Sequence, residues 1–170
     1  MTLPIPRRLA LVTVFGLGHM RPFPGTWGSL PPVFIAGGLF AIGVGPATAP
    51  IQFIAAMVAL VVVFSAACVV LGDRAEARFG KKDPSAVVAD ETAGQALALA
   101  FLPAIAQANL AASIALLLWM FVAFRLLDIA KPWPISAIQR VPGGWGILLD
   151  DLLAGLVVGI ITIVLALTLL

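Results

Sequence analysis

Two pairs of adjacent acids stand out in the sequence, because each pair comes directly before a long stretch without charged residues. Asp90 and Glu91 precede one such stretch, and Asp150 and Asp151 precede another. An acid at the start of a helix is ordinarily a cap, which gains about 0.3–1 kcal/mol from the helix dipole. Two adjacent carboxylates also repel each other, so capping explains a tandem pair less well than a single acid.

A fifth acid, Asp128, lies between two basic residues that could bind phosphate. Arg125 precedes it, Lys131 follows it, and Arg140 comes further along the chain. Magnesium is usually bound by a few carboxylates, water and phosphate oxygens, whereas zinc sites draw mainly on Cys and His. The chain has one Cys and one His, so the acids indicate Mg²⁺ if they bind a metal. From the residues alone, a Mg²⁺–phosphate site and ordinary helix capping both remain open.

Two proline-containing stretches could hold these groups in place. RPFPGTWGS, residues 21–29, is a turn whose backbone amides around Thr26 could bind an anion, or it could simply cap the next helix. DIAKPWPI, residues 128–135, contains two prolines that stop a helix and hold Lys131 close to Asp128. The sequence thus predicts two rigid turns at the edge of the acidic residues.

The composition indicates a membrane protein. The chain of 170 residues is 62% hydrophobic and 11% charged, whereas a soluble domain is roughly 45–50% apolar and about 25% charged. The charges are too few to cover a soluble surface. The net charge of +2, without a basic cluster interleaved with aromatic residues, argues against nucleic-acid binding. The single Cys68 lies in an apolar run and excludes a disulfide framework.

The charged residues fall into three clusters, at residues 7–21, 73–91 and 125–151, separated by long uncharged stretches. A spanning helix needs about 20 apolar residues, and Gly and Pro divide the longer stretches. We therefore expect an all-α membrane bundle of about four to five segments plus a short N-terminal interfacial helix, in a single domain over residues 1–170. The segments are expected near residues 29–45, 50–72, 91–105, 109–126 and 151–170. The third of these is short for a full crossing.

This spacing also predicts the orientation of the chain. If each of the first two pairs of segments is a hairpin, all three charged clusters lie on one side of the membrane. That side carries all ten Lys and Arg residues, and the positive-inside bias identifies it as cytoplasmic. The C-terminus is then expected on the opposite side.

Most of these residues fall in four stretches: GLGHMRPFPGTWGS, KKDPSAVVADETAGQ, FRLLDIAKPWPI and GGWGILLDDLLAG. In order and spacing, from about Gly16 to Gly155, they resemble the phosphatidylglycerophosphatase A family. The resemblance implies a Mg²⁺-dependent, multi-pass phosphatase of the bacterial inner membrane, with its active site facing the cytoplasm. Such an enzyme removes the terminal phosphate of phosphatidylglycerol phosphate to give phosphatidylglycerol. The implied partner is the phospholipid substrate, and no oligomer is predicted.

The resemblance and the residue types together give a set of expected site residues. The expected catalytic acids are Asp90, Glu91, Asp128, Asp150 and Asp151. The expected Mg²⁺ ligands are Asp90, Glu91, Asp150 and Asp151, and the expected phosphate-binding residues are Thr26, Arg125, Lys131 and Arg140. The chain departs from the family pattern at Ser136 and Gln139, where the family usually has Arg and Asp, so no role is assigned to either position.

The chemistry and the competing functions remain open at this point. A metal-activated water is the preferred nucleophile, and attack by Asp128 or Asp150 to form an aspartyl-phosphate is the alternative. A transporter would place its acids near the membrane midplane, whereas these lie at segment ends. A phosphatidyltransferase would carry a longer Asp-rich motif, and an acid-phosphatase-type enzyme would need a second His. A non-catalytic membrane assembly subunit is a further alternative, because Ser136 and Gln139 depart from the family pattern.

Overall fold

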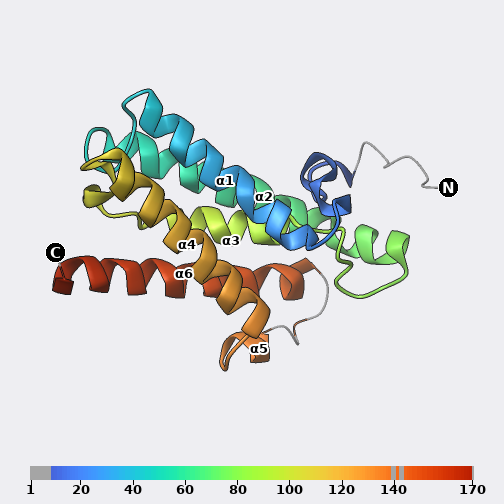
Figure 1. Ribbon diagram of the computed structural model, residues 1–170. Coiled ribbons are helices and arrows are strands. Elements are labelled where there is room, and N and C mark those ends of the chain that lie inside the picture. The colour runs from blue at the N-terminus through green and yellow to red at the C-terminus, as the bar shows by residue number, and fades with distance from the viewer. Residues whose placement is uncertain (1–8, 139–140, 142–143, 170) are drawn as a thin grey trace.

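The computed structural model describes residues 9–138, 141 and 144–169, and this part of the chain is helical without strands. Figure 1 shows long helices running side by side along one direction. The elements are η2 (Val14–His19), α1 (Pro24–Ala41), α2 (Pro50–Phe79), α3 (Ala89–Ala100), η3 (Ala104–Gln107), α4 (Leu110–Ala130), α5 (Ile135–Ile138) and α6 (Gly144–Leu169). The predicted all-α bundle is confirmed.

Three helices are long and apolar enough to cross a membrane: α2, α4 and α6. Among the described residues, three of the four to five expected segments thus qualify as spanning helices by length and composition. The helix α1 does not qualify because its first half is rich in Pro and Gly, including Pro31 and Pro32 within the helix. The helix α3 has 12 residues, and its shortness agrees with the expectation for this segment.

The N-terminal helix packs more deeply than the predicted interfacial helix. Val12 and Thr13 are fully buried, and Val12 packs in one apolar cluster with Val87 and Val88. The carbonyl oxygen of Val12 accepts hydrogen bonds from the amides of Val88 and Ala89, at 3.0 and 3.3 Å. This segment therefore helps to fix the start of α3, where the first acidic pair lies.

The short helix α3 occupies the centre of the bundle and packs against α1, α2, α4 and α6. Small residues allow its closest approach to α6. A Cβ added to Gly155 would collide with the carbonyl oxygen of Gly94, and one added to Gly94 would meet the backbone of Asp151 and the ring of Phe124. Glycine lets helix backbones approach closely in membrane bundles, so this crossing brings the acidic turns of α3 and α6 side by side.

The two loops at the far end of the bundle are joined by Gln107. Its Oε1 accepts hydrogen bonds from the backbone N–H groups of Ala47 and Thr48, at 2.7 and 3.2 Å. The loop after α1 and the loop after α3 therefore meet at one end. This contact agrees with the expected pair of hairpins whose uncharged turns lie opposite the charged clusters.

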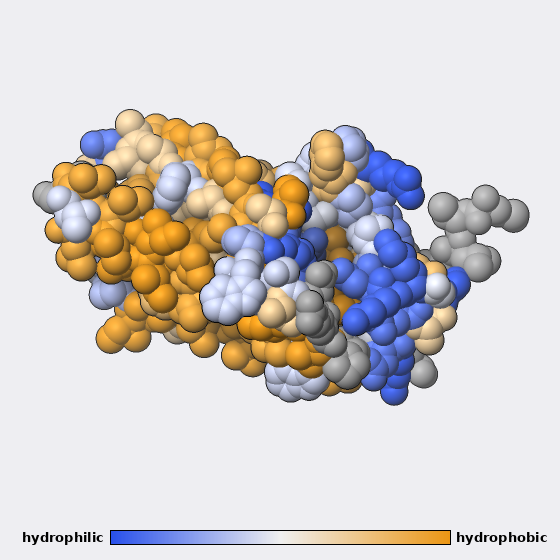
Figure 2. Space-filling model, turned by 90° about the horizontal axis from the view of Figure 1, so that it is seen from below, coloured by the Kyte–Doolittle hydropathy of each residue, from blue (hydrophilic) through white to orange (hydrophobic). Residues whose placement is uncertain are grey.

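The surface separates into a hydrophilic end and a hydrophobic body. Figure 2 shows hydrophilic residues gathered at one end of the viewed face and hydrophobic residues over most of the rest. The exposed side chains of the long helices include Val62 on α2, Leu118 on α4 and Val164 on α6. An exposed apolar surface of this extent is typical of contact with lipid, so the chain is a membrane protein.

Candidate active site

The five acids expected in the site lie in or near the end turns of helices that the bundle brings together, and Asp150 and Asp151 lie one turn inside α6 rather than before it. Asp90 and Glu91 belong to the first turn of α3, Asp128 to the last turn of α4, and Asp150 and Asp151 to α6. Four of them are at most 6% exposed. Ligand oxygens of Asp90, Glu91 and Asp151 lie within 4.8 Å of one another. Three helices thus contribute to one buried acidic cluster.

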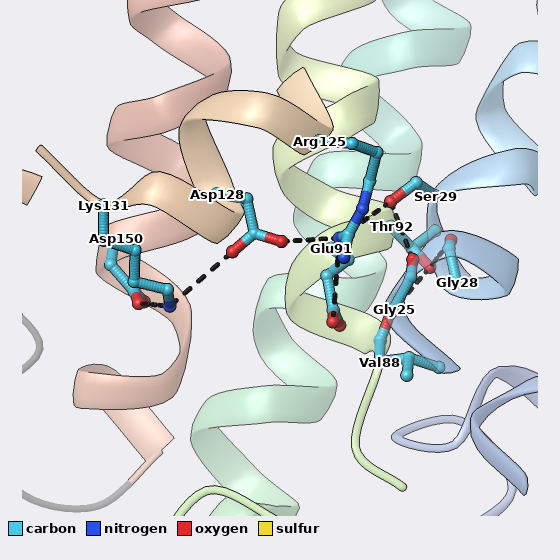
Figure 3. Close-up of polar contacts among 10 residues, drawn as sticks. All are labelled: Gly25, Gly28, Ser29, Val88, Glu91, Thr92, Arg125, Asp128, Lys131 and Asp150. Carbon is cyan, nitrogen blue, oxygen red and sulfur yellow. Dashed lines mark hydrogen bonds and ion pairs between the residues drawn. The ribbon is translucent and has the colours of Figure 1, made fainter. Parts of the chain in front are cut away.

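Arg125 connects this cluster to α1 and α4. Its Nη1 lies 2.5 Å from Oδ2 of Asp128 and 3.9 Å from Oε1 of Glu91. The same nitrogen donates to Oγ of Ser29 at 3.4 Å, and Figure 3 shows the guanidinium between these groups. Because these partners come from α1, α3 and α4, the arginine holds three helices in register at the site.

Lys131 continues the chain of ion pairs toward α6. It directly follows α4, as the two prolines of its stretch predict. Its ammonium hydrogen-bonds to Asp150 and lies 3.6 Å from Oδ1 of Asp128. Although burial lowers the pKa of Lys131, the hydrogen bond to Asp150 and the nearby acids raise it overall. The lysine therefore stays charged, and its expected closeness to Asp128 is confirmed.

The acids fit a divalent cation by the chemistry of their oxygens. Four carboxylate oxygens are buried without a hydrogen-bond partner among the described residues: Oδ1 of Asp90, Oε2 of Glu91, Oδ1 of Asp150 and Oδ2 of Asp151. A buried carboxylate without a partner is costly, and a bound cation removes that cost. A donor set made only of oxygens suits Mg²⁺ or another hard cation. The residues present therefore fit the expected ion.

The expected ligands differ in how closely they gather. Asp90, Glu91 and Asp151 form the compact group, whereas Asp150 lies beside it and shares its Oδ2 with Lys131. The free Oδ1 of Asp150 leaves one oxygen for a ligand. The geometry thus separates three converging acids from a fourth that is already held by a base.

The turn before α1 differs from the expected anion-binding loop. The helix begins at Pro24, so the amides of Gly28 and Ser29 lie inside it, and the amide of Thr26 donates to the carbonyl oxygen of Phe23 at 3.0 Å. Thr26 is half-buried in the first turn. The expected cradle of free amides is therefore wrong for this stretch. Arg140 lies outside the described residues.

Comparison with known proteins decides the family. The sequence profile of the family described as Phosphatidylglycerophosphatase A matches residues 10–166. The chain belongs to the phosphatidylglycerophosphatase A family. This membership makes it a phosphatase, and it favours that prediction over the transporter and the non-catalytic subunit.

Three relatives show which named proteins this member of the phosphatidylglycerophosphatase A family is similar to in sequence. The chain is 32% identical to Phosphatidylglycerophosphatase A of Haemophilus influenzae, over 86% of this chain and 80% of the relative. It is 34% identical to a Bacteroides thetaiotaomicron protein provisionally named phosphatidylinositol-3-phosphatase, over 84% of this chain and 83% of the relative. It is 40% identical to Phosphatidylglycerophosphatase A of Escherichia coli, over 46% of this chain and 42% of the relative. No solved structure matches it significantly.

Sequence reasoning missed the glycines that let α1 approach the site of this family member. A Cβ added to Gly25 would collide with the carboxylate of Glu91 and crowd the guanidinium of Arg125. One turn later, the carbonyl oxygen of Gly28 accepts a 2.6 Å hydrogen bond from Thr92 of α3. The sequence signal was the Gly spacing within the GTWGS stretch, which was interpreted as part of a rigid turn.

A pocket of about 400 Å³ lies between the stretch before α1 and the stretch before α3. It is bounded by the stretch from Gly18 to Pro24 and by Ser85 and Ala86, and its lining includes His19 and Arg21. Both bounding stretches lead directly into the site, one through Gly25 and the other through the start of α3. The pocket therefore offers polar space at the charged end for part of a substrate.

Proposed function

We propose that this protein hydrolyses the terminal phosphate monoester of phosphatidylglycerol phosphate, with Mg²⁺, at the cytoplasmic face of a bacterial inner membrane. The observation that carries this proposal is the set of buried, unpartnered carboxylate oxygens beside Arg125 and Lys131 at the polar end of an apolar bundle. The relatives named Phosphatidylglycerophosphatase A support the choice of substrate.

The chain's own residues divide into those that would hold the cation and those that would face the phosphate. Asp90, Glu91 and Asp151 would hold Mg²⁺, and Asp150 could add its free Oδ1. When bound, Mg²⁺ would supply Lewis-acid stabilisation of the phosphate's negative charge. The site holds five acids and two bases among the described residues, and this excess of acids favours a divalent cation.

Arg125 and Lys131 would exchange part of their contact with acids for contact with phosphate oxygens. Asp128 positions both bases, because its Oδ2 bonds to Arg125 and its Oδ1 faces Lys131. A carboxylate engaged on both oxygens is a poor nucleophile, so this geometry favours water over Asp128. In that route water attacks phosphorus as the bond to the glycerol oxygen breaks. An unpartnered carboxylate oxygen accepts the water's proton, and this proton is then passed to the leaving glycerol oxygen to give the alcohol.

The polar pocket next to Gly25 would receive the rest of the head group, while the acyl chains stay in the bilayer. A second candidate substrate is a phosphoinositide monoester, because the Bacteroides thetaiotaomicron relative is named for one. The acidic cluster and its two bases recognise a phosphate monoester rather than a particular head group. The two candidates therefore share the same chemistry and differ in what the pocket accepts.

Removal of divalent metal is expected to reduce phosphate release to background, and Mg²⁺ is expected to restore it. The reason is that the clustered carboxylates would repel an anionic substrate without a cation. The measurement is phosphate release by the purified chain in detergent micelles, from phosphatidylglycerol phosphate and from phosphatidylinositol 3-phosphate, with and without a chelator. Full activity in the chelator would contradict the metal requirement, and a preference for the phosphoinositide would overturn the substrate.

The orientation is tested by tags placed at the two ends of the bundle. A cysteine introduced next to Lys81 should be labelled by a membrane-impermeant reagent only after the cells have been permeabilised. A cysteine added after Leu170 should be labelled from outside, because α6 would carry the chain from the cytoplasmic side to the opposite side of the membrane. Labelling of both positions from the same side would contradict the proposed orientation, whatever the enzyme's activity.

A further inference from the structure

Gln95 is a buried polar residue that the mechanism above does not use. Its side chain is fully buried on α3, yet neither its Nε2 nor its Oε1 has a hydrogen-bond partner among the described residues. A buried polar group left without a hydrogen bond lowers the stability of the fold. A leucine would fill a similar space without this loss, so the glutamine calls for a functional explanation.

The position of Gln95 directs its amide toward the site. Residues four apart on a helix are neighbours on one face, which places Gln95 one turn beyond Glu91. Side chains on a helix lean toward its N-terminus, and the N-terminal turn of α3 carries the acidic pair. The helical spacing therefore places Gln95 on the same face of α3 as Glu91, the residue that also contacts Arg125.

The unpartnered buried atoms around this point are of two chemical kinds. The four carboxylate oxygens described above suit a cation. The remaining unpartnered atoms are Nε of Arg125, Nε2 and Oε1 of Gln95 and, on α2, Oγ of Ser65. A cation would repel the N–H groups of Arg125 and Gln95, whereas an anionic oxygen accepts hydrogen bonds from them. The site thus has an acceptor side and a donor side.

We propose that Gln95, together with the Nε–H group of Arg125, donates hydrogen bonds to the oxygens of the phosphate group that the site acts on. This inference rests on the proposed function and deepens it, because it names the donors that recognise the phosphate. Gln95 forms the inner wall of the phosphate site, and the carboxylates hold the cation beside it. The bound phosphate satisfies the donor that the protein leaves unpaired.

The decisive variant is Gln95→Leu, measured for stability and for phosphate binding. The midpoint of thermal unfolding in detergent should stay the same or rise, and Mg²⁺ should stabilise the variant as it does the parent. Phosphate release should fall about 10–100-fold, as expected for loss of a hydrogen bond to a charged group. Inhibition by inorganic phosphate should weaken by a similar factor. The rise of the unfolding midpoint that inorganic phosphate causes should weaken too, and this binding readout does not depend on the lipid.

Three further variants separate a binding role from a structural one. Gln95→Glu keeps the size but loses the N–H donors, so it should be at least as impaired as Gln95→Leu. Thr92→Val removes a buried hydroxyl that donates to Gly28, so its unfolding midpoint should fall where that of Gln95→Leu does not. Gln107→Leu alters the far end of the bundle and should leave phosphate release unchanged.

Several results would overturn the proposal. Unchanged inhibition by inorganic phosphate in Gln95→Leu would exclude a phosphate contact. A fall in the unfolding midpoint like that of Thr92→Val would show a structural role. Loss of Mg²⁺ stabilisation would assign the amide oxygen to the cation. If the unmodified chain fails to release lipid phosphate, the proposed function fails, whereas phosphate binding still tests Gln95.

Discussion

Replacement of Asp151 by Asn is expected to abolish phosphate release while leaving the bundle folded. Asp151 is 2% exposed, and its carboxylate is one of three that converge within 4.8 Å. Loss of an outer partner of a metal ligand already lowers affinity or activity about 10–100-fold, so loss of a ligand should exceed about 100-fold. The measurement is phosphate release at saturating Mg²⁺, with helicity followed by circular dichroism.

Stability gives an independent readout of the same variant. Without Mg²⁺, Asp151→Asn should be at least as stable as the parent, because it removes repulsion from Asp90 and Glu91. With Mg²⁺ at 100 times its Kd, the parent should gain about 2.7 kcal/mol and the variant should gain little. Asp73→Asn, an exposed acid on α2, is the matched control. Full activity of Asp151→Asn would remove this residue from the ligand set.

Replacement of Arg125 by Met should both unfold the site and inactivate the enzyme. The side chains of Arg125 and Asp128 are 14% and 9% exposed. Removal of one partner of a buried ion pair lowers the free energy of unfolding by about 3–5 kcal/mol, because the other charge is left uncompensated. Here Asp128 and Glu91 both lose their contact with the guanidinium, so a value near the upper end is expected. The measurement is denaturant unfolding in detergent.

A second substitution separates stability from activity. Adding Asp128→Asn to Arg125→Met should recover part of the lost stability, because one uncompensated carboxylate becomes neutral. Phosphate release should stay at background, since the guanidinium is still missing. Arg74→Met, which changes an exposed arginine on α2, should be near neutral in both measurements. An Arg125→Met protein as stable as the parent would refute the linking role of Arg125.

The acids of the site could be predicted because charge is scarce in this chain. In a sequence so apolar, an acid next to a long uncharged stretch is more readily explained by a function than by the fold. This applies to Asp90, Glu91 and Asp151. The closeness of Lys131 to Asp128 followed from the two prolines after α4. These inferences depend on local sequence and on the cost of charge near lipid, and both are visible without a structure.

The remaining features depend on contacts between distant segments. The pairing of Lys131 with Asp150 joins α4 to α6, and nothing in either stretch selects that partner. The closeness of Gly94 and Gly155 is equally invisible until the helices cross. The importance of Gln95 depends on its burial, whereas in the sequence it is one polar residue in a stretch of small ones. The start of α1 was misplaced because helix formation begins at Pro24 within the turn.

The length of α2 has a consequence for how the substrates arrive. Its 30 residues make a helix about 45 Å long, against a hydrocarbon core of about 30 Å, and its green C-terminal turns extend past the neighbouring helices in Figure 1. With the rest of α2 in the bilayer, residues 80–88 would lie in water before the chain returns to α3. Under the proposed function, ions and water would then approach the acids from the solvent while the acyl chains of the lipid stay in the hydrocarbon core.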